Sequence, residues 1–171
     1  VGDIFFRYIT WGGDGILIGI VCFVFLFVRL RYGILLSLVS FISAFFVSLL
    51  KQFYDEPRPS RYFAGQDVNW VDGIDLYANH SFPSGHAAAA FTMFLLMSFF
   101  FNNKSLTAVF FVLALLVAIS RVYLFQHFLI DVWVGSFCGV VFGTILYHLI
   151  MITPLFKNKT WHNWSLLKSP N

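Results

Sequence analysis

The sequence predicts an all-α fold, a polytopic bundle of helices that span a membrane. Of the 171 residues, 59% are hydrophobic and only 11% are charged, whereas an average soluble domain has about 25% charged residues. The mean hydropathy is +0.79. The apolar residues, among them 23 phenylalanines, form long runs with charged residues at their ends. This arrangement is typical of membrane helices.

Five runs are predicted to span the membrane, at about residues 15–28, 32–50, 87–101, 105–120 and 132–155. The second has no charge over 19 residues, close to the ~20 residues that cross a bilayer. The third and fourth reach a crossing length only if they also include 83–86 and 121–123. Polar residues would then lie at the membrane boundary, because exposing a charge to the lipid interior is costly.

The segments outside these runs have separate predicted roles within one membrane-embedded domain, residues 1–171. Residues 1–13 place Val1, Ile4, Phe5, Tyr8 and Trp11 at helical spacing, which predicts an amphipathic helix in the membrane interface. Residues 52–82 are the most acidic part of the chain, and we expect an outer loop that carries short helices. Residues 156–171 form a polar tail.

The distribution of Lys and Arg predicts the orientation. One set of loops and the tail hold six: Arg29, Arg31, Lys104, Lys157, Lys159 and Lys168. The opposite side holds five, together with all eight acidic residues: Arg7, Lys51, Arg58, Arg61 and Arg121. Because cytoplasmic loops are enriched in Lys and Arg, and three of the second set are candidates for a function, we expect the tail in the cytoplasm and the 52–82 loop outside. The N-terminus then lies outside, which requires a further helix ahead of Val1.

Three polar clusters fall on the predicted outer side. Lys51 precedes Arg58-Pro59, with six residues between Lys and Arg. Pro83-Ser84-Gly85-His86 stands at the start of the third span. Arg121 is followed by five residues and His127, then by three residues and Asp131. Together the clusters offer three cations, two histidines, a hydroxyl and a carboxylate.

These residue types suit transfer of a phosphoryl group. His127 and Asp131 are four residues apart, so we expect them on the same face of a helix. A carboxylate bonded to one ring nitrogen leaves the other free to attack phosphorus. The cations Lys51, Arg58 and Arg121 match the charge that spreads over the equatorial oxygens.

The start of the third span adds an anion site. Ser84 is a good N-cap residue, and the first N–H groups of a helix attract anions. His86 can donate a proton to the leaving oxygen. His80 lies just outside the cluster, and it either contacts the substrate or orders the loop. The histidines lack a second carboxylate or cysteine at ligand spacing, so no metal and no other cofactor is expected.

In this order and spacing, the three clusters resemble the signature of the type 2 phosphatidic acid phosphatase superfamily. That superfamily also contains vanadium haloperoxidases, glucose-6-phosphatase and bacterial lipid phosphatases. The resemblance implies that His127 forms a phosphohistidine, that Asp131 orients it, and that His86 is the general acid. It also implies the residues that hold phosphate: Lys51, Arg58, Ser84, Gly85 and Arg121. The membrane branch usually has six spans, which agrees with a further helix ahead of Val1.

The predicted function is a metal-independent phosphatase in the cytoplasmic membrane, with its site facing the periplasm or the outside. The substrate is a lipid phosphomonoester or diphosphate, such as phosphatidic acid, phosphatidylglycerol phosphate, undecaprenyl diphosphate or a lipid A phosphate. One alternative is a vanadate-dependent haloperoxidase, and another is a membrane transporter without enzymatic activity. A nucleic-acid partner is not expected, because the net charge of +3 is small and divided between both sides.

Overall fold

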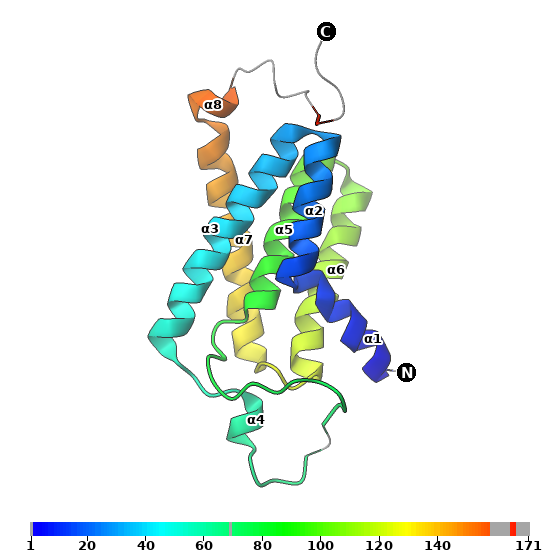
Figure 1. The fold of residues 1–171 in the computed structure, drawn as a ribbon, viewed down its shortest axis with the longest axis vertical. Helices are drawn as coiled ribbons and strands as arrows, with labels where there is room; N and C mark the ends of the chain where they lie inside the picture. The colour runs from blue at the N-terminus through cyan, green and yellow to red at the C-terminus, as the bar shows by residue number, and fades with distance from the viewer. Residues whose placement is uncertain (1, 69, 158–164, 167–171) are drawn as a thin grey trace.

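The structure, a computed structural model, describes residues 2–68, 70–157 and 165–166. The described residues form a bundle of helices (Figure 1) and include no β-strand, which confirms the predicted all-α class. The helices, including the short 3-10 turn η1, follow in this order: α1 (Gly2–Ile9), η1 (Thr10–Gly13), α2 (Gly15–Val28), α3 (Leu30–Tyr54), α4 (Pro59–Tyr62), α5 (Gly85–Phe101), α6 (Lys104–Tyr123), α7 (Leu129–Met151) and α8 (Pro154–Lys157).

Short polar side chains set the ends of several helices. Asp14, Ser84 and Asn103 cap α2, α5 and α6, where each accepts a backbone N–H of the first turn, at 2.8, 3.4 and 3.0 Å respectively. Capping satisfies N–H groups that have no partner within the helix. At the other ends, Asp55 after α3 and Asn102 after α5 adopt left-handed backbone conformations, with φ of 37° and 46°. Asn and Asp tolerate this conformation better than most residues.

Helix α5 is the centre of the bundle and packs closely against both α6 and α7 (Figure 1). Two glycines of α7 make the α5–α7 approach possible. A Cβ on Gly135 would collide with the backbone of Ser84, and one on Gly139 would collide with the backbone of Ala88. At the same crossing, the Thr92 hydroxyl donates to the Gly139 carbonyl at 3.1 Å. Small residues allow such close helix contacts in membranes.

The two ends of the bundle hold different parts of the chain (Figure 1). One end gathers the turn between α2 and α3, the turn between α5 and α6, and α8. The opposite end gathers α4 with its loop, the start of α5, the end of α6 and the start of α7. The predicted alternation of loops therefore brings the three polar clusters to one end.

Several helices are long and apolar enough to cross a membrane, as predicted for a multi-pass protein. Three stretches qualify by length and composition: Leu30–Tyr62, which contains α3 and α4, Lys104–Tyr123 and Leu129–Met151. The bent pair Gly2–Gly13 and Gly15–Val28, with 54° between its parts, forms a fourth if it is counted as one span. Helix α5 is apolar but shorter, with 17 residues. The count of five spans stays a prediction.

The structure moves some predicted boundaries. Helix α3 continues past Lys51 to Tyr54 and ends before Pro57. Helix α7 begins at Leu129, not at 132, and ends at Met151, where a break separates it from α8. Helix α1 buries none of its residues and Trp11 is exposed; its location in the membrane interface stays a prediction. Val1 and most of the predicted tail, including Lys159 and Lys168, lie outside the described residues.

Candidate active site

Four parts of the chain that carry polar residues lie at the end of the bundle that holds α4 (Figure 1). Lys51 comes from the last turns of α3, and Arg58 immediately precedes α4. The cap and first turn of α5 supply Ser84, Gly85 and His86. The third cluster follows at the end of α6 and the start of α7: Arg121, His127 and Asp131. The tertiary structure thus brings all the predicted clusters to one region.

His127 and Asp131 form a buried pair. The imidazole Nδ1 lies 3.6 Å from Asp131 Oδ2, and the two residues are only 2% and 3% exposed. The same carboxylate oxygen accepts the Ser81 hydroxyl at 2.5 Å and the backbone N–H of Phe128 at 2.9 Å. With Nδ1 facing the carboxylate, Nε2 is the ring nitrogen available to a ligand.

The expectation that His127 and Asp131 share a helix face is wrong. His127 lies in the loop before α7, whereas Asp131 is the third residue of that helix. They still meet, because side chains in the first turn of a helix lean toward its N-terminus. The bond from the Phe128 N–H to Asp131 holds the carboxylate in this position. It is the second half of a capping box.

Burial determines the charge of His127. Burial is the main reason that the pKa of the imidazole falls from the ordinary 6.5 to about 4; the hydrogen bond with Asp131 opposes the change, and the nearby cations Arg58, Lys51 and Arg121 add to it. Burial disfavours a charged group, as does a neighbouring like charge. His127 is therefore neutral near pH 7 and has a lone pair for attack on an electrophile.

Three cations surround the pair, and neutral oxygens hold each of them. Lys51 Nζ donates to the His80 carbonyl at 2.8 Å. Arg58 donates through Nη1 to the Gln126 side chain at 3.1 Å and through Nε to a loop carbonyl at 3.0 Å. Arg121 Nη1 donates to the Thr10 hydroxyl at 2.7 Å. Among the described residues none of the three forms a salt bridge with a carboxylate, so their charge is available to an anionic ligand.

The start of α5 faces the same region. Ser84 is the N-cap and is fully buried, and its backbone N–H donates to the Asp131 carbonyl at 2.9 Å. Gly85 follows and lies next to the Lys51 side chain: a Cβ added to this glycine would be 3.6 Å from Lys51 Cε. The positive end of the helix dipole and the three cations favour the same ligand, an oxyanion such as phosphate.

His80 takes part in the loop. Its carbonyl accepts from Lys51, and its Nδ1 lies 3.0 Å from Asp55 Oδ1. The residue has a left-handed backbone with φ of 56°. Of the two roles left open by the sequence, this geometry favours ordering of the loop and of the Lys51 ammonium.

Four residues of the site were not predicted. Ser81 bonds Asp131, Gln126 accepts from Arg58 and also from Arg121 at 3.5 Å, Thr10 accepts from Arg121, and the Asp14 carboxylate lies 4.0 Å from His86 Nε2. Gln126 had a signal, because a glutamine beside His127 interrupts an apolar stretch. Thr10 and Asp14 had no such sequence signal, because their partners, Arg121 and His86, are more than 70 positions away in the chain.

Two cavities reach the polar clusters. One of about 120 Å³ lies between α3 and α5 and is lined by Lys51, Gly85, Val47 and Ala88, among others. The other, of about 530 Å³, touches Asp131, and its aromatic lining comes from the end of α3, from α4 and from the loops: Tyr54, Tyr62, Phe82 and Phe128. In the part of the chain that the structure describes, no group of three or more His, Cys, Asp or Glu side chains is placed to hold a metal ion.

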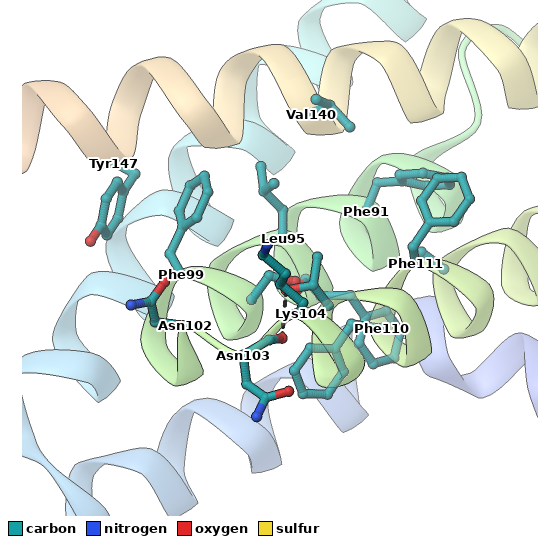
Figure 2. A pocket seen from close by; sticks show the side chains of 14 residues that line it. Phe91, Leu95, Phe99, Asn102, Asn103, Lys104, Phe110, Phe111, Val140 and Tyr147 are labelled. Carbon is teal, nitrogen blue, oxygen red and sulfur yellow. Dashed lines mark hydrogen bonds between the residues drawn. The ribbon is translucent and has the colours of Figure 1, made fainter.

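A larger cavity lies elsewhere in the bundle. It is a groove of about 830 Å³ between α5, α6 and α7 that extends to the α5–α6 turn. Figure 2 shows Phe99, Phe110 and Tyr147 around it, with Asn102 and Lys104 at the turn. Its lining contains no paired acid and base, so its residues do not offer the chemistry that the polar clusters offer.

Comparisons with known proteins agree with this geometry. The family model described as PAP2 superfamily matches residues 30–153. Among solved structures, the chain is similar to LpxE of Aquifex aeolicus, with 30% identity, a TM-score of 0.76 and 85% of each chain covered. It also shares its fold with the first transmembrane PAP2 type phosphatidylglycerolphosphate phosphatase from Bacillus subtilis, with 23% identity, a TM-score of 0.72, and 89% of this chain and 78% of that chain covered. No curated protein is similar enough to count as a match. The family match covers more than half of the sequence and contains all three polar clusters, and the chain therefore belongs to the PAP2 superfamily.

Proposed function

We propose that this protein is a membrane phosphatase that hydrolyses a lipid phosphomonoester or diphosphate through a phosphohistidine at His127. One observation carries the proposal: a buried, neutral histidine with a carboxylate on one ring nitrogen stands beside three cations that are not paired with carboxylates. A nucleophile next to concentrated positive charge suits attack on a phosphate group.

The proposed cycle has two displacements at phosphorus. His127 Nε2 attacks, the P–N bond forms, and the bond from phosphorus to the lipid oxygen breaks. That oxygen takes a proton from His86 and leaves as the alcohol or, from a diphosphate, as the lipid monophosphate. Water then attacks the phosphohistidine and gives its proton to His86, which releases inorganic phosphate and regenerates both histidines. Asp131 stabilises the positive charge on His127 during the first step. Lys51, Arg58, Arg121 and the start of α5 stabilise the equatorial oxygens.

The position of the site supports a lipid substrate. The polar clusters lie at one end of apolar helices, where a lipid headgroup meets a bilayer. The cavity beside Lys51 and Gly85 continues between α3 and α5 along Val47 and Ala88, so the phosphate region borders apolar surface. We further propose that this end faces the periplasm or the outside of the cytoplasmic membrane. A transporter would place charges along the middle of its spans, whereas Lys51, Arg121 and Asp131 stand near helix ends.

Phosphate release from a panel of lipids tests the function. Purified protein in detergent should release phosphate from at least one of phosphatidic acid, phosphatidylglycerol phosphate, undecaprenyl diphosphate and a lipid A phosphate. The phosphatidylglycerolphosphate named for the Bacillus subtilis neighbour is the first to try. Orthovanadate should inhibit, because it adopts the geometry of pentacoordinate phosphorus, and EDTA should not. A soluble sugar phosphate is the control. Hydrolysis of none of the lipids would contradict the proposal.

The protonation of His127 can be measured directly. The chain has five histidines, and ¹⁵N NMR of the imidazoles in detergent should show that the ring of His127 stays neutral until about pH 4, because burial lowers its pKa to about 4. The assignment follows from the signal lost in His127→Asn. Protonation of that signal near 6.5, the ordinary value, would show that the ring is solvated.

A further inference from the structure

Asp14 stands at the start of α2 with one carboxylate oxygen free. Its Oδ1 caps α2 by accepting the N–H of Ile16 at 2.8 Å. Its Oδ2 lies 4.0 Å from Nε2 of His86, in the first turn of α5. Both side chains are partly open to solvent, 42% for Asp14 and 32% for His86.

Close packing of the preceding turn holds Asp14 there. A Cβ on Gly13 would collide with the backbone carbonyl of His86, so η1 lies directly on the start of α5. Three residues earlier, the Thr10 hydroxyl accepts from Arg121 on α6. The chain bends by 54° between Gly2–Gly13 and Gly15–Val28. Asp14 is the residue between these two segments, and the packing of Gly13 on His86 therefore places Asp14 beside the His86 side chain.

Asp14 differs in charge from the other titratable groups near His86. Four titratable groups from α3, the loop before α4, α6 and the loop before α7 act electrostatically on the ring: Lys51, Arg58, Arg121 and His127. None of them is an acid. Asp131, the other buried carboxylate of the site, already bonds Ser81 and pairs with His127. Among the described residues, Asp14 is the acid paired with His86.

We propose that Asp14 is a positioning residue for His86: its free oxygen holds the Nε2–H edge of the protonated ring, so that Nδ1–H faces the leaving oxygen. The inference rests on the proposed phosphatase function. As the bond from phosphorus to the leaving oxygen breaks, the Nδ1 proton passes to that oxygen, and the ring becomes neutral while Asp14 stays ionised. Water returns the proton in the second step. The site then contains two His–carboxylate pairs, Asp131 with the nucleophile and Asp14 with the acid.

Asp14→Asn isolates the charge from the cap. Asn caps a helix as well as Asp, so the start of α2 is kept while the negative charge is lost. Hydrolysis of an alkyl or lipid phosphate, whose leaving oxygen needs a proton, should fall about 10- to 100-fold, since general acid catalysis contributes roughly 10²–10⁴. Nitrophenyl phosphate releases nitrophenolate, a stable anion that needs no proton. Its rate of hydrolysis should therefore change less than about threefold.

A double variant and two controls complete the test. Because Asp14 acts through His86, Asp14→Asn in a His86→Ala background should cause no further loss, a non-additivity expected of residues that act as a unit. Asp3→Asn, which removes the acid that accepts from Tyr123, should leave both substrates unaffected, and melting temperatures should match the wild type. Equal losses on both substrates, or an additive double variant, would overturn the proposal. A wild type that hydrolyses neither substrate would overturn the proposed function, and this inference with it.

Discussion

His127→Ala should abolish phosphate release from every lipid that the wild type hydrolyses, with a loss of at least about 10⁴-fold in kcat, as for other nucleophiles that form a covalent intermediate. The imidazole is buried, neutral and turned with Nδ1 toward Asp131, and no other described histidine pairs with a buried carboxylate. Water cannot replace the imidazole, because the site would then have no nucleophile held in position for attack on phosphorus. Single-turnover assays with a labelled phosphate should also find no labelled protein.

Two further variants separate chemistry from folding. His127→Asn keeps a polar group of similar size in the buried space, and it should be as inactive as the alanine variant while its melting temperature stays near that of the wild type. His148→Ala is the matched histidine control, since His148 lies in the last turn of α7 at the opposite end of the bundle. It should keep full activity. Retained phosphate release by both His127 variants would refute the assignment of the nucleophile.

Arg121→Met should lower kcat about 10²- to 10³-fold, the size of effect seen when a preorganised donor to transition-state charge is removed. Arg121 is 7% exposed, and it is held by Thr10 and Gln126. Its guanidinium is thus ordered before a ligand arrives, and it forms no salt bridge with a carboxylate of the described residues. Steady-state kinetics should show a larger change in kcat than in KM, because charge on the equatorial oxygens increases in the transition state.

The lysine variant shows which property of Arg121 matters. Arg121→Lys keeps the charge but loses the planar fork of donors, so it should recover only part of the activity. Arg29→Met is the control, because Arg29 precedes α3 at the far end of the bundle and contacts Tyr32. An Arg121→Met enzyme with normal kcat would show that this cation does not contact the phosphoryl group.

The helices could be predicted because their signals are local. Apolar runs bounded by charges, and caps such as Ser84 and Asn103, depend on neighbours within one turn, and α2 matches its predicted range of 15–28. Two of the boundaries that differ, at the end of α3 and the start of α7, lie where the helix continues past a charged residue, Lys51 or Asp131. A hydropathy argument ends a span at its first charge, whereas the backbone continues to Asp55, whose left-handed conformation ends α3.

Some residues of the candidate site could be predicted from the sequence, and others could be assigned only from the structure. The three clusters are recognisable from residue types and spacing, because each lies within at most eleven consecutive residues. The relation between His127 and Asp131 was predicted for the wrong reason, since their meeting depends on a capping bond at the start of α7 and not on a shared helix face. Ser81 and Gln126 could not be assigned, because a hydroxyl or an amide becomes specific only through the partner that it reaches.

By itself, the sequence determined that this protein is a helical membrane protein with the three polar clusters of the PAP2 superfamily, since hydropathy and residue spacing are properties of the chain alone. The tertiary structure decided which groups support those clusters. Thr10 and Asp14 meet Arg121 and His86 only because η1 packs on α5 and α6 and the chain bends by 54° before α2. Contacts between residues so far apart depend on how helices cross, and the close approach of Gly13 to the backbone of His86 sets that crossing here.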